Sequence, residues 1–311
     1  MDATLNIGEP WMWAAFIGFV LVMLAVDLFL VGGNKAHKVG FREAAAWSFV
    51  WFSLAMLFNL GLWWHLKGAY GGEVADLKAM EFLTGYLIEK SLAVDNIFVF
   101  LMIFSFFAVP AEYQRRVLIY GVIGAIVLRA VMILAGAWLV KEFHWILYLF
   151  GAFLVITGVK MLMFAEVEPD LSKNPLLNWI KRHIRLTPDY RGEKFWVMEN
   201  GVRTFTPLFL VLIMIEISDL IFAVDSIPAI FAITTDPFIV FTSNIFAILG
   251  LRAMYFMLAG MADRFHLLKY GLALVLVFVG TKMLIVDFYK IPVGLSLGIV
   301  GLIIATFMFA S

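Results

Sequence analysis

Hydrophobic positions along the chain gather into nine runs of about 18 to 30 residues, separated by polar segments. A helix needs roughly 20 apolar residues to cross about 30 Å of hydrocarbon, so each run predicts a membrane span. The predicted fold class is therefore all-α, a polytopic transmembrane helical bundle. The nine expected spans are residues 11–31, 44–64, 77–107, 117–139, 143–164, 204–235, 238–259, 267–286 and 291–310.

Lysine and arginine are distributed unevenly between the two sets of loops. One set includes the single long loop, residues 165–203, and carries most of the basic side chains. Because basic loops resist translocation, we expect the N-terminus outside and the C-terminus in the cytoplasm. The chain then divides into spans one to five (1–164), a cytoplasmic loop (165–203) and spans six to nine (204–311). The opposite loops hold only Lys67, Lys78, Lys141 and Lys290.

Residues 77–164 resemble residues 204–286, which indicates an internal repeat. The segment EKSLAVDN from Glu89 aligns with DLIFAVDS from Asp219, and GVKML from Gly158 aligns with GTKML from Gly280. Each unit has three spans, an odd number, so the second copy must be inverted relative to the first. Inverted repeats are typical of secondary transporters, whose substrate site lies near the bilayer midplane.

Composition narrows the class of protein further. Hydrophobic residues make up 63% of the 311 positions, against roughly 45–50% in soluble proteins, so we expect the lipid bilayer to surround the chain. The 23 basic and 23 acidic side chains balance, and no dense basic face predicts binding to nucleic acid. The chain has no cysteine, which excludes disulfides and thiolate metal sites.

Six carboxylates fall within the predicted spans. Each costs about 2.5–3.5 kcal/mol at a helix centre, so it must pair, protonate or bind a cation. Basic side chains also lie within spans, and one interpretation is that these charges form buried salt bridges or gates. The acids are Asp27, Glu89, Asp95, Glu216, Asp219 and Asp225, and the bases are Lys90, Arg129, Lys160, Arg252 and Lys282.

Most of the acids cluster in the third and sixth spans, together with the neutral oxygen ligands Asn96, Ser218 and Ser226. Such an oxygen-rich, negatively charged set suits a hard divalent cation such as Mg²⁺, Ca²⁺ or Mn²⁺. The histidines fall at span ends or in loops, which argues against a soft metal site.

Spacing limits how these acids can share one site. Residues six apart on a helix point about 120° away from each other, so neither Glu89 and Asp95 nor Asp219 and Asp225 share a narrow face. Either the members of each pair have different roles, or the helices are interrupted. Pro228 favours an interruption, because it removes the hydrogen bond to the carbonyl of Val224. The hypothesis is that this carbonyl oxygen coordinates the ion.

Single polar residues in other spans have less specific interpretations. Asp27 is a candidate gate, proton carrier or arginine partner. Asn59 and Asn244 are typical of hydrogen bonds between membrane helices.

The segments 89–96 and 216–230 resemble the two signature segments of the TerC family, and the match continues through 235–238 and 244–254. The resemblance covers nearly the whole chain and is closest to the Alx branch of bacterial inner-membrane proteins. It implies manganese export, in the superfamily that includes the LysE exporters. The family is also linked by name to tellurite resistance, and some members to metal loading of secreted proteins. The functional residues carried over are Glu89, Asp95, Asn96, Glu216, Asp219 and Asp225.

The function predicted from the sequence is a secondary transporter that exports Mn²⁺ across the bacterial inner membrane by alternating access. No phosphate-binding loop is present to couple ATP, so a proton or cation gradient would drive it. One alternative is a membrane scaffold or metallation partner of the secretion machinery, in which the buried charges are structural. Another is transport of a different ion, such as Ca²⁺. No catalytic residues are expected, and the sequence does not indicate an oligomeric state.

Overall fold

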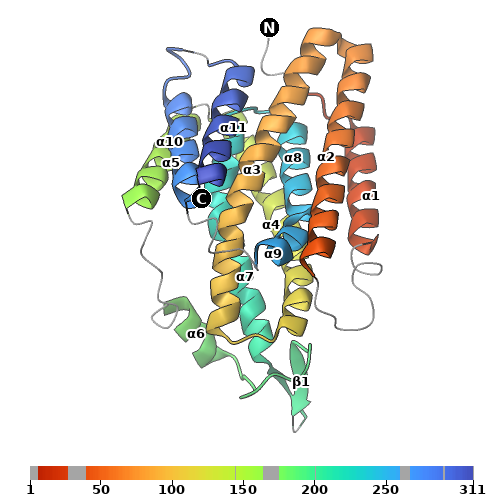
Figure 1. The fold of residues 1–311 in the computed structure, drawn as a ribbon, viewed down its shortest axis with the longest axis vertical. Helices are drawn as coiled ribbons and strands as arrows, with labels where there is room; N and C mark the ends of the chain where they lie inside the picture. The colour runs from red at the N-terminus through yellow and green to blue at the C-terminus, as the bar shows by residue number, and fades with distance from the viewer. Residues whose placement is uncertain are drawn as a thin grey trace.

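The computed structural model describes residues 6–26, 40–143, 145–163, 175–199, 201–259, 267–289 and 291–310, without the side chains of Asp95, Leu176 and Leu268. The chain forms a bundle of long helices, with a short helix and a β-hairpin at one end (Figure 1). The elements are α1 (Pro10–Val26), α2 (Phe41–Tyr70), α3 (Gly72–Phe106), α4 (Ala111–Glu142), α5 (Ile146–Met163), α6 (Pro175–His183), β1 (Trp196–Glu199), β2 (Val202–Phe205), α7 (Pro207–Phe231), α8 (Pro237–Leu249), α9 (Leu251–Leu258), α10 (Leu268–Leu284) and α11 (Val293–Ala310).

Most of the long helices are apolar on all sides, which is typical of helices in lipid or in a buried core. Among the described residues, six helical segments are long and apolar enough to cross a membrane. This agrees with a polytopic helical membrane protein, while the crossing of all nine expected spans stays a prediction. The six segments are Phe41–Tyr70, Ala111–Glu142, Ile146–Met163, Pro207–Phe231, Pro237–Leu258 and Val293–Ala310.

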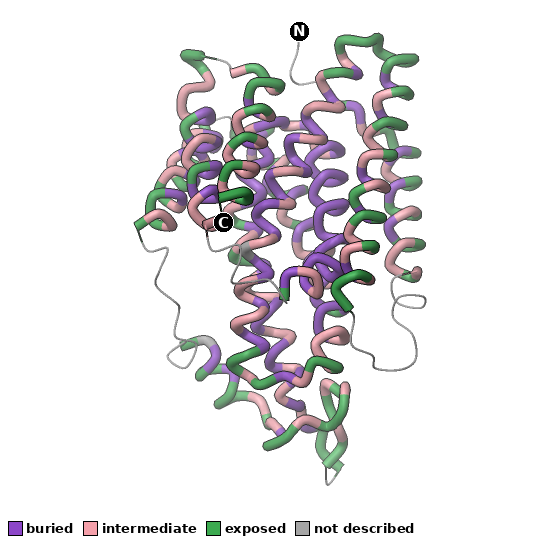
Figure 2. The backbone as a smooth tube through the Cα atoms, in the orientation of Figure 1, coloured by how far each residue is buried: buried purple, intermediate pink, exposed green. Residues whose placement is uncertain are grey.

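The core of the bundle surrounds α8, in which every residue from Phe238 to Leu249 is buried. Helices α3 and α4 pack along α8, and both also pack against α7. Helices α1 and α2 lie on one side of this core, and α5, α10 and α11 lie on the other (Figure 1). Buried positions gather along the middle of the bundle, and exposed positions along its flanks (Figure 2).

Helices α5 and α10 pack closely along each other, and glycine makes their contact possible. A Cβ atom added to Gly280 would lie 2.7 Å from the carbonyl oxygen of Gly151, and one added to Gly151 would lie 2.9 Å from that of Gly280. A Cβ at Gly158 would lie 2.7 Å from the carbonyl oxygen of Ala273. Because residue numbers rise on one helix as they fall on the other, the two helices are antiparallel.

Helix α7 continues without interruption through Pro228, so the helix break predicted there is wrong. A proline removes one helical hydrogen bond, but the flanking residues Ser226, Ile227, Ala229 and Ile230 are all buried, and their packing holds the helix. Val224 lies on the exposed face of α7, with 43% of its surface accessible. Coordination of the ion by the carbonyl of Val224 stays a prediction.

The segment between α5 and α7 includes a β-hairpin. Strands β1 and β2 are antiparallel, with Glu199 opposite Val202, and Gly201 supplies the positive φ of 76° that the turn requires. Helix α6 buries Leu177 and Ile180 against the protein. The following loop is fixed to the end of α3 by a 2.7 Å hydrogen bond from the Tyr190 hydroxyl to the carbonyl of Phe107.

Candidate functional site

Arg129 lies at the centre of the buried charges. It belongs to α4, and only 1% of its surface is accessible. Its Nη2 donates to Oδ1 of Asp219 at 2.9 Å, its Nε lies 3.3 Å from Oδ2 of the same carboxylate, and its Nη1 donates to Oε1 of Glu89. One guanidinium therefore binds a carboxylate from α3 and a carboxylate from α7, and the bond to Asp219 is bidentate.

Neutral side chains complete the hydrogen bonds of these two carboxylates. Asn244 donates from Nδ2 to Oε2 of Glu89 at 3.0 Å, and Asn96 donates to Oδ1 of Asp219 at 3.3 Å. Nη1 of Arg129 lies 3.3 Å from the hydroxyl oxygen of Ser226. We call this set the central cluster, and it comprises Glu89, Asn96, Arg129, Asp219, Ser226 and Asn244.

The central cluster is buried and carries a net negative charge. Its six side chains come from α3, α4, α7 and α8, and all are classed as buried. Two carboxylates and one guanidinium leave a formal charge of −1. Oδ1 of Asn96 is buried and accepts no hydrogen bond from any described residue. Among the described residues, the cluster thus offers a spare oxygen and an uncompensated charge, which suit an added cation.

Glu216 lies about one turn before Asp219 on α7, toward the end of the bundle that carries the hairpin. Its Oε2 atom is buried and has no hydrogen-bond partner within the described ranges. The carboxylate lies against Gly124 of α4, where an added Cβ would overlap it. The structure therefore brings Glu216 near Asp219 but outside the network held by Arg129.

Asp225 points to a different part of the bundle. Its carboxylate accepts a hydrogen bond from Thr157 of α5, whereas Asp219 binds Arg129 of α4. The two acids of α7 thus have different partners on a continuous helix. Their spacing left open either different roles for the two acids or an interrupted helix, and the structure agrees with different roles. The side chain of Asp95 is not among those described, and Asp27 lies outside the described residues.

The basic residues predicted within spans divide into separate environments. Lys160 is exposed in the last turn of α5, so its prediction as a buried charge is wrong, because it lies on the outward face of that helix with the exposed Phe153 and Ile156. Lys90 donates to the carbonyl of Ala247 at 3.2 Å. Arg252 is buried and lines a small pocket with Trp47, Trp51 and Arg115. Lys282 is buried and interacts electrostatically with Glu81.

Both asparagines predicted to bond between helices do so. Asn59 of α2 donates to the carbonyl of Ala79 in α3, and Asn244 of α8 donates to the carboxylate of Glu89 in α3. A different polar residue was missed. Lys78 was counted among loop lysines, yet it lies within α3 with 1% of its surface accessible. It bridges Glu81 and Asp236. The helical pattern that continues upstream of Glu89 could have indicated that Lys78 belongs to the helix and not to a loop.

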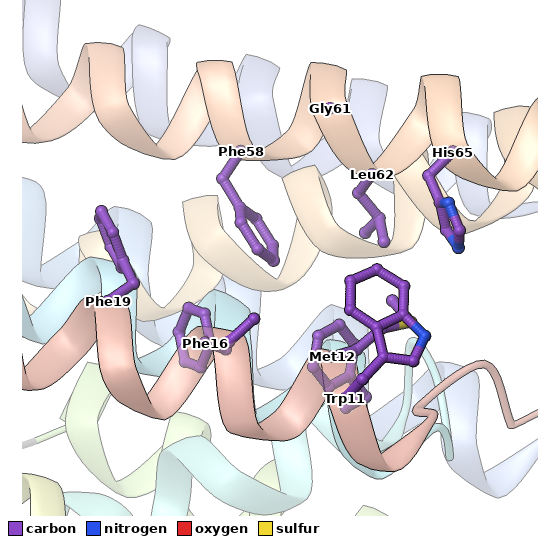
Figure 3. Close-up of a pocket in the computed structure, with 10 residues that line it drawn as sticks. Trp11, Met12, Phe16, Phe19, Phe58, Gly61, Leu62 and His65 are labelled. Carbon is purple, nitrogen blue, oxygen red and sulfur yellow. The ribbon is translucent and has the colours of Figure 1, made fainter.

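A separate apolar pocket of about 310 Å³ lies between α1 and α2. Figure 3 shows Trp11, Phe16, Phe58 and His65 around it. The Trp11 and His65 rings meet edge to face, with their centroids 5.3 Å apart. Among the described residues, no carboxylate lines this pocket to balance the charge of a cation.

Comparisons with known proteins place the chain among bacterial membrane proteins. The model of the integral membrane protein TerC family matches residues 74–311. The protein described as "Putative membrane-bound redox modulator Alx" in Escherichia coli (strain K12) is 60% identical over 304 residues, covering 97% of this chain and 95% of that protein. An "Uncharacterized membrane protein STKORF319" from Myxococcus xanthus is 51% identical over 311 residues, covering 100% and 95%. A Rickettsia felis "Uncharacterized membrane protein" is 42% identical, covering 92% of each. No solved structure matches the chain significantly.

Proposed function

Because this chain belongs to the TerC family of integral membrane proteins, we propose that it is a secondary transporter that exports Mn²⁺. The central cluster would bind the ion. The observation that carries the proposal is the pairing of Glu89 and Asp219 on one guanidinium in the middle of the bundle. Two carboxylates buried in a membrane protein need a positive charge beside them. A transported cation can supply this charge in place of the guanidinium of Arg129.

The ligand chemistry supports a hard divalent ion. Glu89 and Asp219 offer carboxylate oxygens, and Asn96 and Asn244 add amide oxygens, while Ser226 adds a hydroxyl. Oxygen sets of this kind suit Mg²⁺, Ca²⁺ and Mn²⁺. The choice of manganese among them rests on the family resemblance, and Ca²⁺ is the nearest alternative cargo.

Antiparallel packing of α5 and α10 supports alternating access. Gly158 and Gly280 are equivalent in the predicted repeat, and so are the positions of Gly151 and Ala273. The contact of Gly151 with Gly280 therefore has as its counterpart the contact of Ala273 with Gly158. Paired contacts of this kind are what a two-fold axis in the membrane plane would produce. Two inverted halves can then rock about the central cluster.

Glu216 is placed to receive the ion before it reaches Asp219. It lies nearer the hairpin end, which the distribution of basic residues assigns to the cytoplasm, with the N-terminus outside the bacterial inner membrane. Its carboxylate oxygen Oε2 has no protein hydrogen bond within the described ranges. Carboxylates that exchange a metal ion for protons would couple export to a proton gradient.

A scaffold or metallation partner of the secretion machinery is the second candidate. The observation that favours the scaffold is that Arg129 binds one carboxylate of α3 and one of α7, because such an ion network can hold the two helices together. The Alx relatives are described as membrane-bound redox modulators, which suggests a role in redox control. This chain has no cysteine, so such a role would not use a thiol of its own.

Metal-selective flux tests the proposal. In inverted membrane vesicles, we expect energy-dependent uptake of Mn²⁺ in preference to Mg²⁺, Ca²⁺ and Zn²⁺. A protonophore should abolish uphill movement. The Asp219→Asn variant should lose this flux at equal abundance, and Glu199→Gln, which changes an acid of the hairpin, should retain it. Folded protein with no flux of any divalent ion would reject transport in favour of the scaffold.

A further inference from the structure

A second buried ion network lies at the end of the bundle opposite the hairpin. Nζ of Lys78 lies 3.0 Å from Oε2 of Glu81 and 3.4 Å from Oδ2 of Asp236. Thr234 donates its hydroxyl to the same Oε2 of Glu81 at 2.7 Å. All four side chains are buried. We call this set, Lys78, Glu81, Thr234 and Asp236, the end layer.

The end layer joins segments that are far apart in the sequence. Lys78 and Glu81 belong to α3, whereas Thr234 and Asp236 lie in the turn between α7 and α8. The N–H of Ile7 donates to Oδ2 of Asp236 at 3.0 Å, which fixes the segment before α1 to that turn. From α10, Lys282 interacts electrostatically with Glu81.

The N-terminal segment packs closely over this turn. Ile7 is 1% exposed. A Cβ atom added to Gly8 would lie 2.9 Å from Cβ of Phe238 at the start of α8. Asp236 also accepts the N–H of Phe238 at 3.0 Å, so its carboxylate both caps α8 and binds the N-terminal segment. The end layer therefore closes this end of the described core.

The end layer and the central cluster use the same pair of helices. Glu81 and Glu89 are eight residues apart on α3, and Asp236 and Asn244 are eight apart along α8. Eight helical residues correspond to about 12 Å, so two polar layers lie about 12 Å apart along the bundle. A cation leaving the central cluster toward the N-terminal end would meet the end layer next.

We propose that the end layer is the exit gate of the transporter, in which the arriving cation replaces Lys78 on Glu81 and Asp236. This inference rests on the proposed function. In the closed gate, the ammonium of Lys78 holds α3 against the turn between α7 and α8. A dication gives the two carboxylates their counter-charge, so Lys78 is released and the N-terminal segment separates from the turn.

The absence of cysteine from the chain permits a test without background labelling. Thr234→Cys places one thiol in the end layer, and Ile7→Cys places one in the N-terminal segment. A membrane-impermeant thiol reagent is applied to each variant in whole cells and in inverted vesicles, with and without Mn²⁺ on the cytoplasmic side. Glu73→Cys, at an exposed position of α3, is the fully labelled control, and Ala55→Cys, buried in α2, is the unlabelled control.

A second substitution opens the gate without Mn²⁺. Asp236→Asn keeps a residue that caps α8 well but removes the charge that binds Lys78. We expect Mn²⁺ to raise the labelling rate at Thr234→Cys and Ile7→Cys by about tenfold, and Asp236→Asn to do so without Mn²⁺. A tenfold change corresponds to about 1.4 kcal/mol in the opening equilibrium.

Flux measured on the same samples separates this inference from the proposed function. Mn²⁺ flux together with unchanged labelling in both tests would overturn the gate and leave the exporter standing. Folded protein without Mn²⁺ flux would overturn the exporter, and with it an exit gate. Flux together with faster labelling, from the side that the N-terminus faces, supports the gate.

Discussion

Glu89 and Asp219 occupy equivalent positions in the two predicted repeats, and the guanidinium of Arg129 binds both carboxylates. Arg252, the equivalent of Arg129 in the second repeat, instead lines a pocket with Trp47 and Trp51. Arg129 therefore binds one acid from each predicted repeat. This asymmetry is expected if the cluster must hold a positive charge when no cargo is bound.

Removing the guanidinium should make the protein depend on a dication for stability. Arg129→Met leaves Glu89 and Asp219 buried without their partner, which typically costs about 3–5 kcal/mol. If Mn²⁺ can take the place of the guanidinium, it should raise the melting temperature of the variant more than that of the wild type. Thermal unfolding of the purified protein, with and without Mn²⁺, measures this.

The matched control is Arg191→Met, which removes an exposed pair with Glu199 in the hairpin segment and should cost about 1 kcal/mol or less. A loss of stability in Arg129→Met that Mn²⁺ does not reduce would favour the structural role of the cluster.

Glu216 needs the space that Gly124 leaves beside it. Gly124→Ala places a Cβ where the carboxylate now lies, so we expect Mn²⁺ flux to fall about tenfold, or about 1.4 kcal/mol. Gly18→Ala is the control, because a Cβ there has no neighbour within 4 Å. Equal flux from both variants at equal abundance would show that the position of Glu216 is unimportant.

Close packing of α5 against α10 should be intolerant of one methyl group. Gly280→Ala places a Cβ 2.7 Å from the backbone carbonyl of Gly151, and overpacking of this kind costs about 1–3 kcal/mol. Gly301→Ala in α11 meets no atom within 4 Å and should not destabilise. The melting temperatures of the two variants test this prediction. Similar values would indicate that the backbones of α5 and α10 lie further apart.

Tyr190 should give a pH dependence above pH 10. Burial raises the pKa of Tyr190 from 10.0 to about 12 in the folded protein. The protonated hydroxyl therefore contributes stability below pH 10, and this contribution is lost as the pH rises toward 12. Tyr190→Phe removes that dependence along with the bond to Phe107, so the stability difference from wild type should shrink from pH 9 to pH 11. A constant difference over that range would assign the effect to packing alone.

Long apolar runs and buried charges made much of this protein predictable. Hydropathy located the helices, because an apolar run of about 20 residues in a helix satisfies its own backbone hydrogen bonds in lipid. The cost of a charge in hydrocarbon singled out Glu89, Asp219 and Arg129, which the structure brings together. The positions of these residues in the predicted repeat indicated which acids would be equivalent.

Other features depend on tertiary packing that the sequence does not display. Pro228 favoured a break in α7, but buried neighbours keep the helix continuous. Lys78 resembled a loop lysine because its partner Asp236 is distant in the sequence. Lys160 resembled a buried charge because its place in an apolar run does not reveal that it lies on the outward face of α5.

Equilibrium binding of Mn²⁺ to the purified protein tests most directly whether the central cluster holds the cargo. Wild-type protein should bind Mn²⁺ saturably. Asp219→Asn keeps the size of the side chain and an oxygen for Arg129 but removes one charge, so its affinity should fall about tenfold or more. Glu199→Gln should bind as the wild type does. Equal affinity of Asp219→Asn and wild type would contradict the assignment of the central cluster as the cation site.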